Sequence, residues 1–457
     1  SMANVLRKYS PQLTRRPTQL TAHLGAWAAS AGTAILATGL VMAPLAHAQE
    51  LELSGDIAGE VRYFPDDPMF PGQFDDFQPS LIFQGEARWE TEDRKHQIVF
   101  KPFFRLDGQD DERTHFDVRE GYYRFNSHQN WSLTIGAAKV FWGRTESRHL
   151  VDIINQADAV EDIDEEDKLG QPMVNLTIIK DFGTIDLFVL PGFRTRTFPG
   201  VEGRLRFDPV VDTDTPLFER DAGRAGVDFA ARYGHYIGNW DFGVSIFHGT
   251  SREARFAFSA PSLAGTPIDP ASFVFDPAAL PDDAIIQPVY DRITQGSFDL
   301  QYTKDAWLWK LEALVREGQG DVFAAAVGGF EYTLYQIFGS GADLGLLAEY
   351  QYDGRDTDIV ADQFGIGLAA PVTVADNDIF SGARLALNDA QDTSLLIGGV
   401  VDTTDATTSM FMEASRRFGQ NWTGELEARL FFNVDPTNFV DAFRNDDFLT
   451  LRITRYF

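Results

Sequence analysis

Apolar and polar residues alternate along most of the chain from Leu51 to Phe457. A period of two is typical of a β-strand whose two faces meet different surroundings. In the clearest segment, one face holds Trp422, Gly424, Leu426, Ala428, Leu430 and Phe432, and the other holds Thr423, Glu425, Glu427, Arg429 and Phe431. Three charged residues on one face are costly to bury in a dry core. The pattern therefore predicts an all-β transmembrane barrel, with one strand face toward lipid and the other toward water.

The lengths of the connections give a strand count. Short turns are predicted near residues 92–95, 127–130, 181–184, 235–239, 304–306, 339–342, 390–393 and 419–421. Connections that are often longer are predicted at 65–78, 108–114, 145–170, 195–222, 251–290, 318–321, 354–375, 403–405 and 435–446. Short periplasmic turns and long extracellular loops are the rule for such barrels. The eight turns and nine loops predict an antiparallel barrel of 18 strands, with 16 as the alternative.

Four tryptophans follow directly on predicted short turns: Trp131, Trp240, Trp307 and Trp422. An amphipathic indole favours the membrane interface, so these residues are interpreted as an aromatic girdle on the periplasmic side. Chance placement is the alternative interpretation.

The first 48 residues are interpreted as a signal peptide with a basic start, an apolar stretch and a cleavage site at Ala46, His47 and Ala48. Ser1 ahead of Met2 is interpreted as a cloning remnant. Residues 49–457 are then a single barrel domain, with both termini in the periplasm because the strand number is even. The leader carries four basic and no acidic residues, so its removal changes the formal net charge from −29 to −33.

Composition excludes several classes of function. A strongly acidic chain is unsuited to nucleic acid, which requires clustered lysine and arginine. The absence of cysteine excludes disulfides, zinc–thiolate sites and thiol catalysis. No stretch after Ala48 is long and apolar enough for a transmembrane helix. The histidines lack metal-ligand spacing and no catalytic or nucleotide-binding motif occurs, so we expect neither an enzyme nor a cofactor.

The last nine residues run from Leu449 to Phe457 with apolar side chains at alternate positions and a terminal phenylalanine. This ending resembles that of Gram-negative outer-membrane porins and related barrels. Arg455 departs from it, although near the interface it could snorkel. The resemblance implies an outer-membrane location, contact with outer-membrane lipid and lipopolysaccharide, and an assembly signal at Phe457 for the barrel-assembly machinery. The strand count and a lumen of both charge signs also look like the alginate-export and substrate-specific porin groups, from which no residue is carried over.

A barrel of this size is wide enough to leave a lumen. The predicted lumen wall includes Arg88, Arg105, Glu312, Arg316, Glu425, Glu427 and Arg429, and other inward candidates include Asp299, Glu349, Arg384 and Glu413. Rings of such charges set solute preference in pores. The alternative is that they pair across neighbouring strands and hold the wall together.

Residues 145–170 give the most specific local signal. Leu150, Ile153, Ile154, Ala157 and Val160 follow helical spacing, and an acidic run comes next. Its members are Glu161, Asp162, Asp164, Glu165, Glu166 and Asp167. Porins fold a loop inward from a similar position, so the resemblance implies an acidic constriction that favours cations. The alternative is an exposed acidic loop that could hold divalent cations near lipopolysaccharide. A calcium-binding EF-hand does not fit, because no glycine lies at its sharp turn.

Three functions remain open. The leading hypothesis is a channel for small polar, cationic solutes. A conduit or receptor for hydrophobic molecules is the runner-up, motivated by the 38 phenylalanines and by a Pro/Phe-rich connection at 251–290 that could be a lid or could pack over the rim. A structural or adhesion barrel with a closed lumen is the third.

Overall fold

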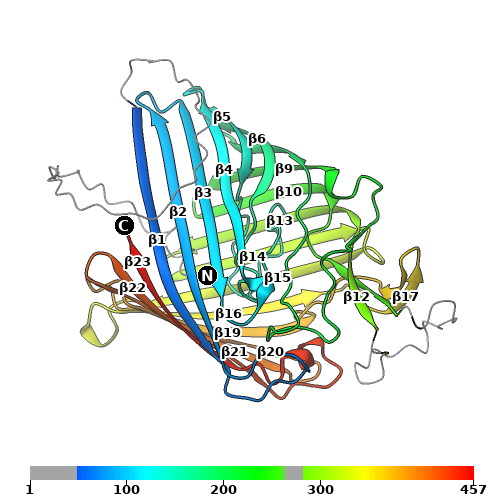
Figure 1. Cartoon of the computed structure of the whole chain (residues 1–457). Helices are drawn as coiled ribbons and strands as arrows, with labels where there is room; N and C mark the ends of the chain where they lie inside the picture. The colour runs from blue at the N-terminus through cyan, green and yellow to red at the C-terminus, as the bar shows by residue number, and fades with distance from the viewer. Residues whose placement is uncertain (1–48, 261, 263–280, 282) are drawn as a thin grey trace, which may run out of the picture.

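The computed structural model describes residues 49–457 except 261, 263–280 and 282 (Figure 1). Eighteen strands form one antiparallel sheet. They are β1 (Gln49–Tyr63), β2 (Phe77–Thr91), β3 (His96–Asp107), β4 (His115–Asn126), β5 (Trp131–Ala138), β6 (Gln171–Lys180), β7 (Gly183–Pro191), β9 (Val227–Ile237), β10 (Trp240–Thr250), β13 (Arg292–Lys304), β14 (Trp307–Glu317), β15 (Phe323–Leu334), β16 (Asp343–Asp353), β19 (Asn377–Ala386), β20 (Ser394–Asp402), β21 (Thr408–Phe418), β22 (Trp422–Phe432) and β23 (Phe448–Tyr456).

The sheet closes on itself. Each wall strand pairs with its neighbour along the wall, and the first strand pairs with the last, with Asp56 opposite Tyr456 and Tyr63 opposite Leu449. Closure leaves no strand edge to be satisfied by water, which is what a sheet in lipid requires. The predicted 18-stranded antiparallel barrel is confirmed, and the alternative of 16 is wrong.

The two ends of the barrel differ in their connections. At the turn end, strands are joined by short turns such as 92–95, 127–130 and 419–421, as predicted. Gly419 has a φ of +65° there, a conformation that side-chain-bearing residues rarely adopt. At the loop end, toward the lower right of Figure 1, the connections include 139–170, 192–226 and 251–291. The two described ends of the chain, in β1 and β23, both lie at the turn end.

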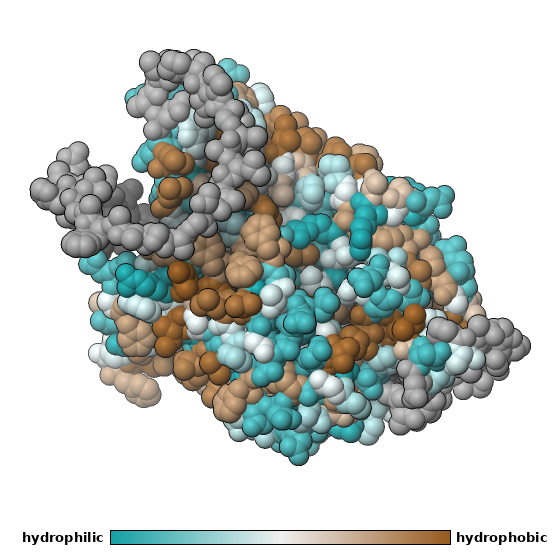
Figure 2. Space-filling model, in the orientation of Figure 1, coloured by the Kyte–Doolittle hydropathy of each residue, from teal (hydrophilic) through white to brown (hydrophobic). Residues whose placement is uncertain are grey.

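The outer wall is apolar. The four predicted girdle tryptophans each begin a strand at the turn end, with between 38% and 47% of their surface exposed. Leu449, Leu451, Ile453 and Phe457 are also exposed, and Arg455 lies over the ring of Trp422 at 5.2 Å. Figure 2 shows apolar side chains over the visible wall and hydrophilic ones gathered toward the loop end. A closed barrel with an apolar outer face is the architecture of outer-membrane porins.

Smaller elements lie outside the wall. A second sheet of five short strands contains β8 (Leu217–Phe218), β11 (Arg255–Ser259), β12 (Ile285–Tyr290), β17 (Ile359–Asp362) and β18 (Gly365–Leu368). Figure 1 places β12 and β17 at the loop end. Short 3₁₀ helices include η1 (Asp111–Arg113), η2 (Gly223–Ala225), η6 (Ile337–Gly339) and η7 (Phe439–Phe443). Within the described chain, no helix has the length and apolar character needed to cross a membrane.

Candidate functional site: the barrel lumen

One connection, residues 139–170, enters the lumen, and we call it the lumen loop. It leaves the wall after Ala138, six residues before the predicted start, because Trp142 turns inward and packs against Phe188. The helical spacing of its apolar residues suggested a helix, but this stretch forms turns and isolated bridges. Some of its backbone N–H groups donate to wall carboxylates, as the contacts of Glu312 and Glu349 below demonstrate, and others bond to carbonyls within the loop.

The apolar residues of the lumen loop are buried. Val151, Ile153 and Ile154 join a cluster with Phe188 and Leu190 of β7, and Leu150 packs in a second cluster on β14 and β15. On this side the inner wall is therefore apolar and dry, and it holds the loop as a core would. Burying a large aliphatic side chain contributes about 1.5–3 kcal/mol, so several such residues fix the loop firmly.

The first limb of the lumen loop, residues 144–148, reaches the wall formed by β13 to β19. The buried carboxylate of Glu312 accepts hydrogen bonds from the backbone N–H groups of Arg144, Thr145 and Val151 at 2.5, 3.0 and 3.1 Å. Glu349 accepts from the N–H groups of Glu146 and Ser147 at 2.8 Å each. Glu312, a predicted lumen-wall residue, is thus an anchor for the loop and accepts from its backbone N–H groups and from the Thr145 hydroxyl.

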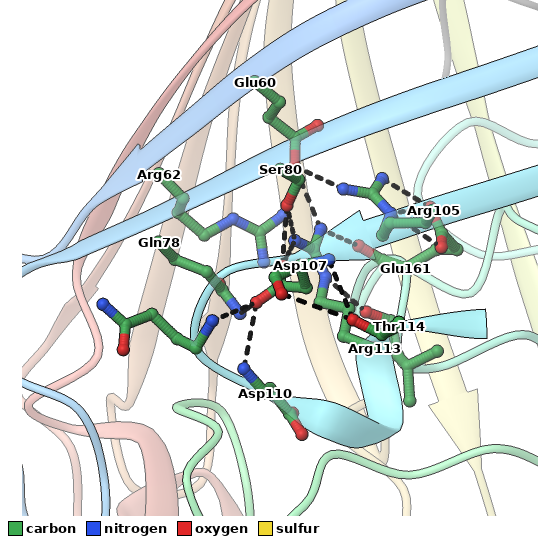
Figure 3. Close-up of polar contacts among 12 residues, drawn as sticks. Glu60, Arg62, Gln78, Ser80, Arg105, Asp107, Asp110, Arg113, Thr114 and Glu161 are labelled. Carbon is green, nitrogen blue, oxygen red and sulfur yellow. Dashed lines mark hydrogen bonds and ion pairs between the residues drawn. The ribbon is translucent and has the colours of Figure 1, made fainter. Parts of the chain in front are cut away.

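The second limb, residues 158–164, is anchored to the opposite wall by buried ion pairs (Figure 3). Arg105 of β3 donates to Glu161 at 2.5–3.0 Å and to Glu60 of β1 at 2.7 Å. Arg113 of η1 donates to the backbone carbonyls of Val160 and Glu161 at 2.8 and 3.1 Å. Paired charges with satisfied hydrogen bonds can be buried, whereas removal of one partner leaves the other uncompensated.

Further ion pairs extend this anchorage. Asp162 pairs with Arg62 of β1 at 2.8 Å and lies 3.6 Å from Arg429 of β22, and Asp158 pairs with Arg119 of β4. Glu165 pairs with Arg196 at 2.6 Å. Most of the acidic run therefore contacts the inner wall, and Glu165 remains exposed.

His149 provides a positive charge within the lumen loop. Burial opposes its protonation, but the hydrogen bond to Glu166 at 3.0 Å and the nearby carboxylates raise the pKa of His149 to about 9. Burial and the charge of Asp162 raise the pKa of Asp164 well above its usual value. The loop therefore carries fewer net negative charges than its sequence suggests.

The lumen loop leaves two cavities beside the wall of β19 to β22. The loop-side chamber spans about 2580 Å³, part of it open to solvent, and is lined by the loop, by β14, β16 and β19 to β22, and by segments from the loop end. The turn-side chamber encloses about 940 Å³ and is lined by the loop and by residues of β19 to β23 nearer the turns.

The two chambers share three lining residues: Glu146, Asp164 and Glu413. We call this place the junction. Glu146 and Asp164 come from the two limbs of the lumen loop, and Glu413 comes from β21. Glu146 pairs with Arg384 at 2.6 Å, and Asp164 lies 3.6 Å from Arg429. Burial opposes ionisation of Glu146, but Arg384 and Lys310 hold the pKa of its carboxyl below the usual value.

Glu413 lies directly opposite Glu427 of β22 in the strand register. Like charges at directly opposed positions are unfavourable for a sheet. In the described part of the chain, Glu413 and Glu425 form no salt bridge and no hydrogen bond through their side chains. Both line the turn-side chamber, where eight of the described lining residues are acidic and two are basic.

The predicted site residues fall into two groups. Arg105, Glu312, Arg316 and Arg429 pair with other residues, Arg316 with Glu253 and Gln295, as the pairing alternative anticipated. Arg88 lies near the turn end and pairs with Glu90 at 3.4 Å. Glu425, Glu427, Asp164 and Asp167 line the turn-side chamber.

Sequence reasoning missed several residues of this site. Glu60 and Arg62 lie at alternate positions on the polar face of β1, a signal that could have revealed them. Nothing in the sequence distinguished Glu146 from neighbouring loop residues.

Among the described residues, two groups could present ligands to a cation: His115, Asp158 and Glu161, and Asp376, Asp378 and Asp402. Arg105 and Arg119 already pair with the carboxylates of the first group.

Comparisons with known proteins give likenesses of structure only. No family model and no curated protein matches the chain. A BenF-like porin from Pseudomonas fluorescens Pf-5 is 10% identical, with 90% of this chain and 98% of that chain covered and a TM-score of 0.49. OpdO of Pseudomonas aeruginosa is 11% identical, with 89% and 96% covered and a TM-score of 0.47. Wzi of Escherichia coli, a carbohydrate-binding β-barrel involved in group 1 capsule assembly, is 10% identical, with 88% and 83% covered and a TM-score of 0.45.

Proposed function

We propose that this protein is a channel across the outer membrane of a Gram-negative bacterium, and that it passes small polar solutes with a preference for cations. The observation that carries the proposal is the junction, where carboxylates from both limbs of the lumen loop and from β21 meet between two cavities. A charged ring at a constriction favours ions of the opposite sign. We further propose that the turn end faces the periplasm, with both termini there, as is the rule for such barrels.

The surplus of acidic side chains supports the cation preference. Eight of the described residues lining the turn-side chamber are acidic and two are basic. Most charges in the lumen form ion pairs, including those of Glu146, Glu161, Asp162 and Glu427 in this chamber, so they contribute little to the field that a solute meets. Within the described chain Glu413 and Glu425 form no salt bridge, although Glu425 lies opposite Arg452 in the strand register, and both face the chamber. They are the wall residues that we assign to solute selection.

The two alternative functions, a conduit for apolar molecules and a structural barrel, would require a different lumen. A conduit for fully apolar molecules would have to move its cargo past the carboxylates of the turn-side chamber, which is costly without water. A structural barrel with a closed lumen would have no need of two cavities that share lining carboxylates. In this proposal the protein is not an enzyme.

The test is the current through a planar lipid bilayer containing the purified protein. We expect an ohmic current and a reversal potential in a KCl gradient that indicates K⁺ over Cl⁻. In Glu413→Gln/Glu425→Gln the preference should fall about fivefold per carboxylate, as expected for about 1 kcal/mol each. Glu92→Gln is the matched control, because Glu92 lies exposed in a short turn at the turn end.

The channel and its cation preference would each be contradicted by a different result. No current from correctly folded barrels would leave the closed structural barrel. A current with no cation preference in the parent protein would refute the charge assignment while leaving the channel.

A further inference from the structure

The two chambers of the lumen differ in aromatic content. Eight phenylalanines are among the described residues lining the loop-side chamber, and none is among those lining the turn-side chamber. Phe207, Phe411 and Phe439 are partly exposed in this part of the lumen, and Phe411 stacks on the buried Phe380 at a ring distance of 6.1 Å. Partly exposed rings held by buried ones offer a firm apolar surface to a solute.

The charges of the loop-side chamber nearly cancel. Nine of its described lining residues are acidic and eight are lysine or arginine, and the raised pKa of His149 adds a ninth positive charge. Many of them are mutually paired, as in Glu253 with Arg316 and Arg355. This chamber therefore discriminates weakly by charge and more strongly by shape and apolar surface.

A solute crossing the lumen meets the two chambers in series. The aromatic surface of Phe411 lies on β21 two positions from Glu413, and alternate residues of a strand share a face. A single solute can therefore lie against the aromatic ring and direct a positive group toward the carboxylate of the junction. The loop-side chamber is of the size of ordinary small-molecule sites, so there is space for a small organic solute.

We propose that the preferred solutes are organic cations with an aromatic or compact apolar body, of the arylalkyl-ammonium class. This inference rests on the proposed function, because it assumes passage through the junction. Aromatic faces attract cations and bury apolar groups, so the loop-side chamber retains such a solute. The acidic turn-side chamber then admits it by charge. An aromatic anion satisfies only the first chamber, and a small compact cation satisfies only the second.

The test uses three probes in planar bilayers containing the full barrel. Benzyltrimethylammonium has both the ring and the charge, tetramethylammonium has the charge alone, and benzoate has the ring alone. We expect benzyltrimethylammonium to interrupt the K⁺ current with a residence time about threefold to tenfold longer than that of tetramethylammonium, as a cation–π contact would produce. Benzoate should give no such interruptions.

Two substitutions identify the surface responsible. Phe411→Leu keeps an apolar side chain and removes the ring, so the residence time of benzyltrimethylammonium should fall to that of tetramethylammonium while the K⁺/Cl⁻ preference stays. Phe439→Ala tests the second ring in the loop segment and does not alter a wall strand. Phe338→Ala is the matched control, since Phe338 is fully exposed at the turn end and should have no effect.

The outcomes separate the two proposals. A cation-selective current with equal residence times for the two ammonium probes overturns the aromatic inference and leaves the proposed function intact. Longer residence of benzoate than of benzyltrimethylammonium overturns the inference in favour of an aromatic anion. Loss of K⁺/Cl⁻ preference in the parent protein removes the proposed function and this inference with it.

Discussion

The inner wall that carries the lumen loop and the inner wall that faces the chambers use charged residues differently. On the covered wall, Arg105, Glu312 and Glu349 lie in contact with the loop, and each has hydrogen-bond partners in it. On the open wall, Glu413 opposes the like-charged Glu427. Charge in a barrel interior therefore has two roles, and burial with a partner separates the structural role from the solute-facing one.

Deleting part of the lumen loop, which covers one inner wall, gives the sharpest test of this comparison between the two walls. Deletion of residues 157–167 takes away the second limb, and we expect single-channel conductance to rise severalfold because the loop crosses the lumen. Cation preference should weaken because Asp164 leaves the junction. Bilayer recordings with a melting curve of the same sample provide the measurement. Unchanged conductance in a folded barrel would show that the loop does not limit the passage.

Removing one residue that anchors the lumen loop should have a smaller effect than deleting the second limb. Arg105→Ala leaves Glu60 and Glu161 in a buried site without this partner, and we expect a loss of about 3–5 kcal/mol in the stability of the folded barrel or of the docked loop. Urea unfolding in lipid vesicles measures the stability of the folded barrel, and open-channel noise measures the stability of the docked loop.

A surface pair gives the matched control for that anchor. Arg417 pairs with Asp392 at 2.6 Å with both side chains largely exposed, so Arg417→Ala should cost less than about 1 kcal/mol. Equal losses in the two variants would contradict the assignment of Arg105 as an anchor.

The smallest predicted effect is a pH dependence of selectivity. Burial and Asp162 raise the pKa of Asp164, so its carboxyl is neutral in acid and becomes charged only as the pH rises through that raised value. Cation preference should therefore increase with pH above the usual aspartate range near 4, since the junction then gains a negative charge. Reversal potentials across a pH series measure it. Asp164→Asn should reduce this increase, with the carboxyl of Glu413 remaining at the same junction, and an unaltered pH profile in that variant would assign the titration to another group.

The chain pattern determined much of the fold. Alternation in β22 predicted which residues face lipid and which face the lumen, because a period of two follows from strand geometry alone. Short turns at residues 127–130 and 419–421 were placed correctly, since each joins two alternating segments and has a strand-starting tryptophan behind it. β7 was less informative, because it is apolar on both faces where the lumen loop packs against it.

The sequence by itself determined the barrel, its strand number and the apolar side of the lumen loop, because these depend on local periodicity and on turn length. Only the tertiary structure decided what the charges do. Glu161 and Asp164 lie three residues apart in one acidic run, yet one is fixed by the buried Arg105 and the other lines the junction. Their roles depend on partners more than 50 residues away in the chain, which local pattern does not encode. The junction itself exists because two limbs of one loop meet a distant strand.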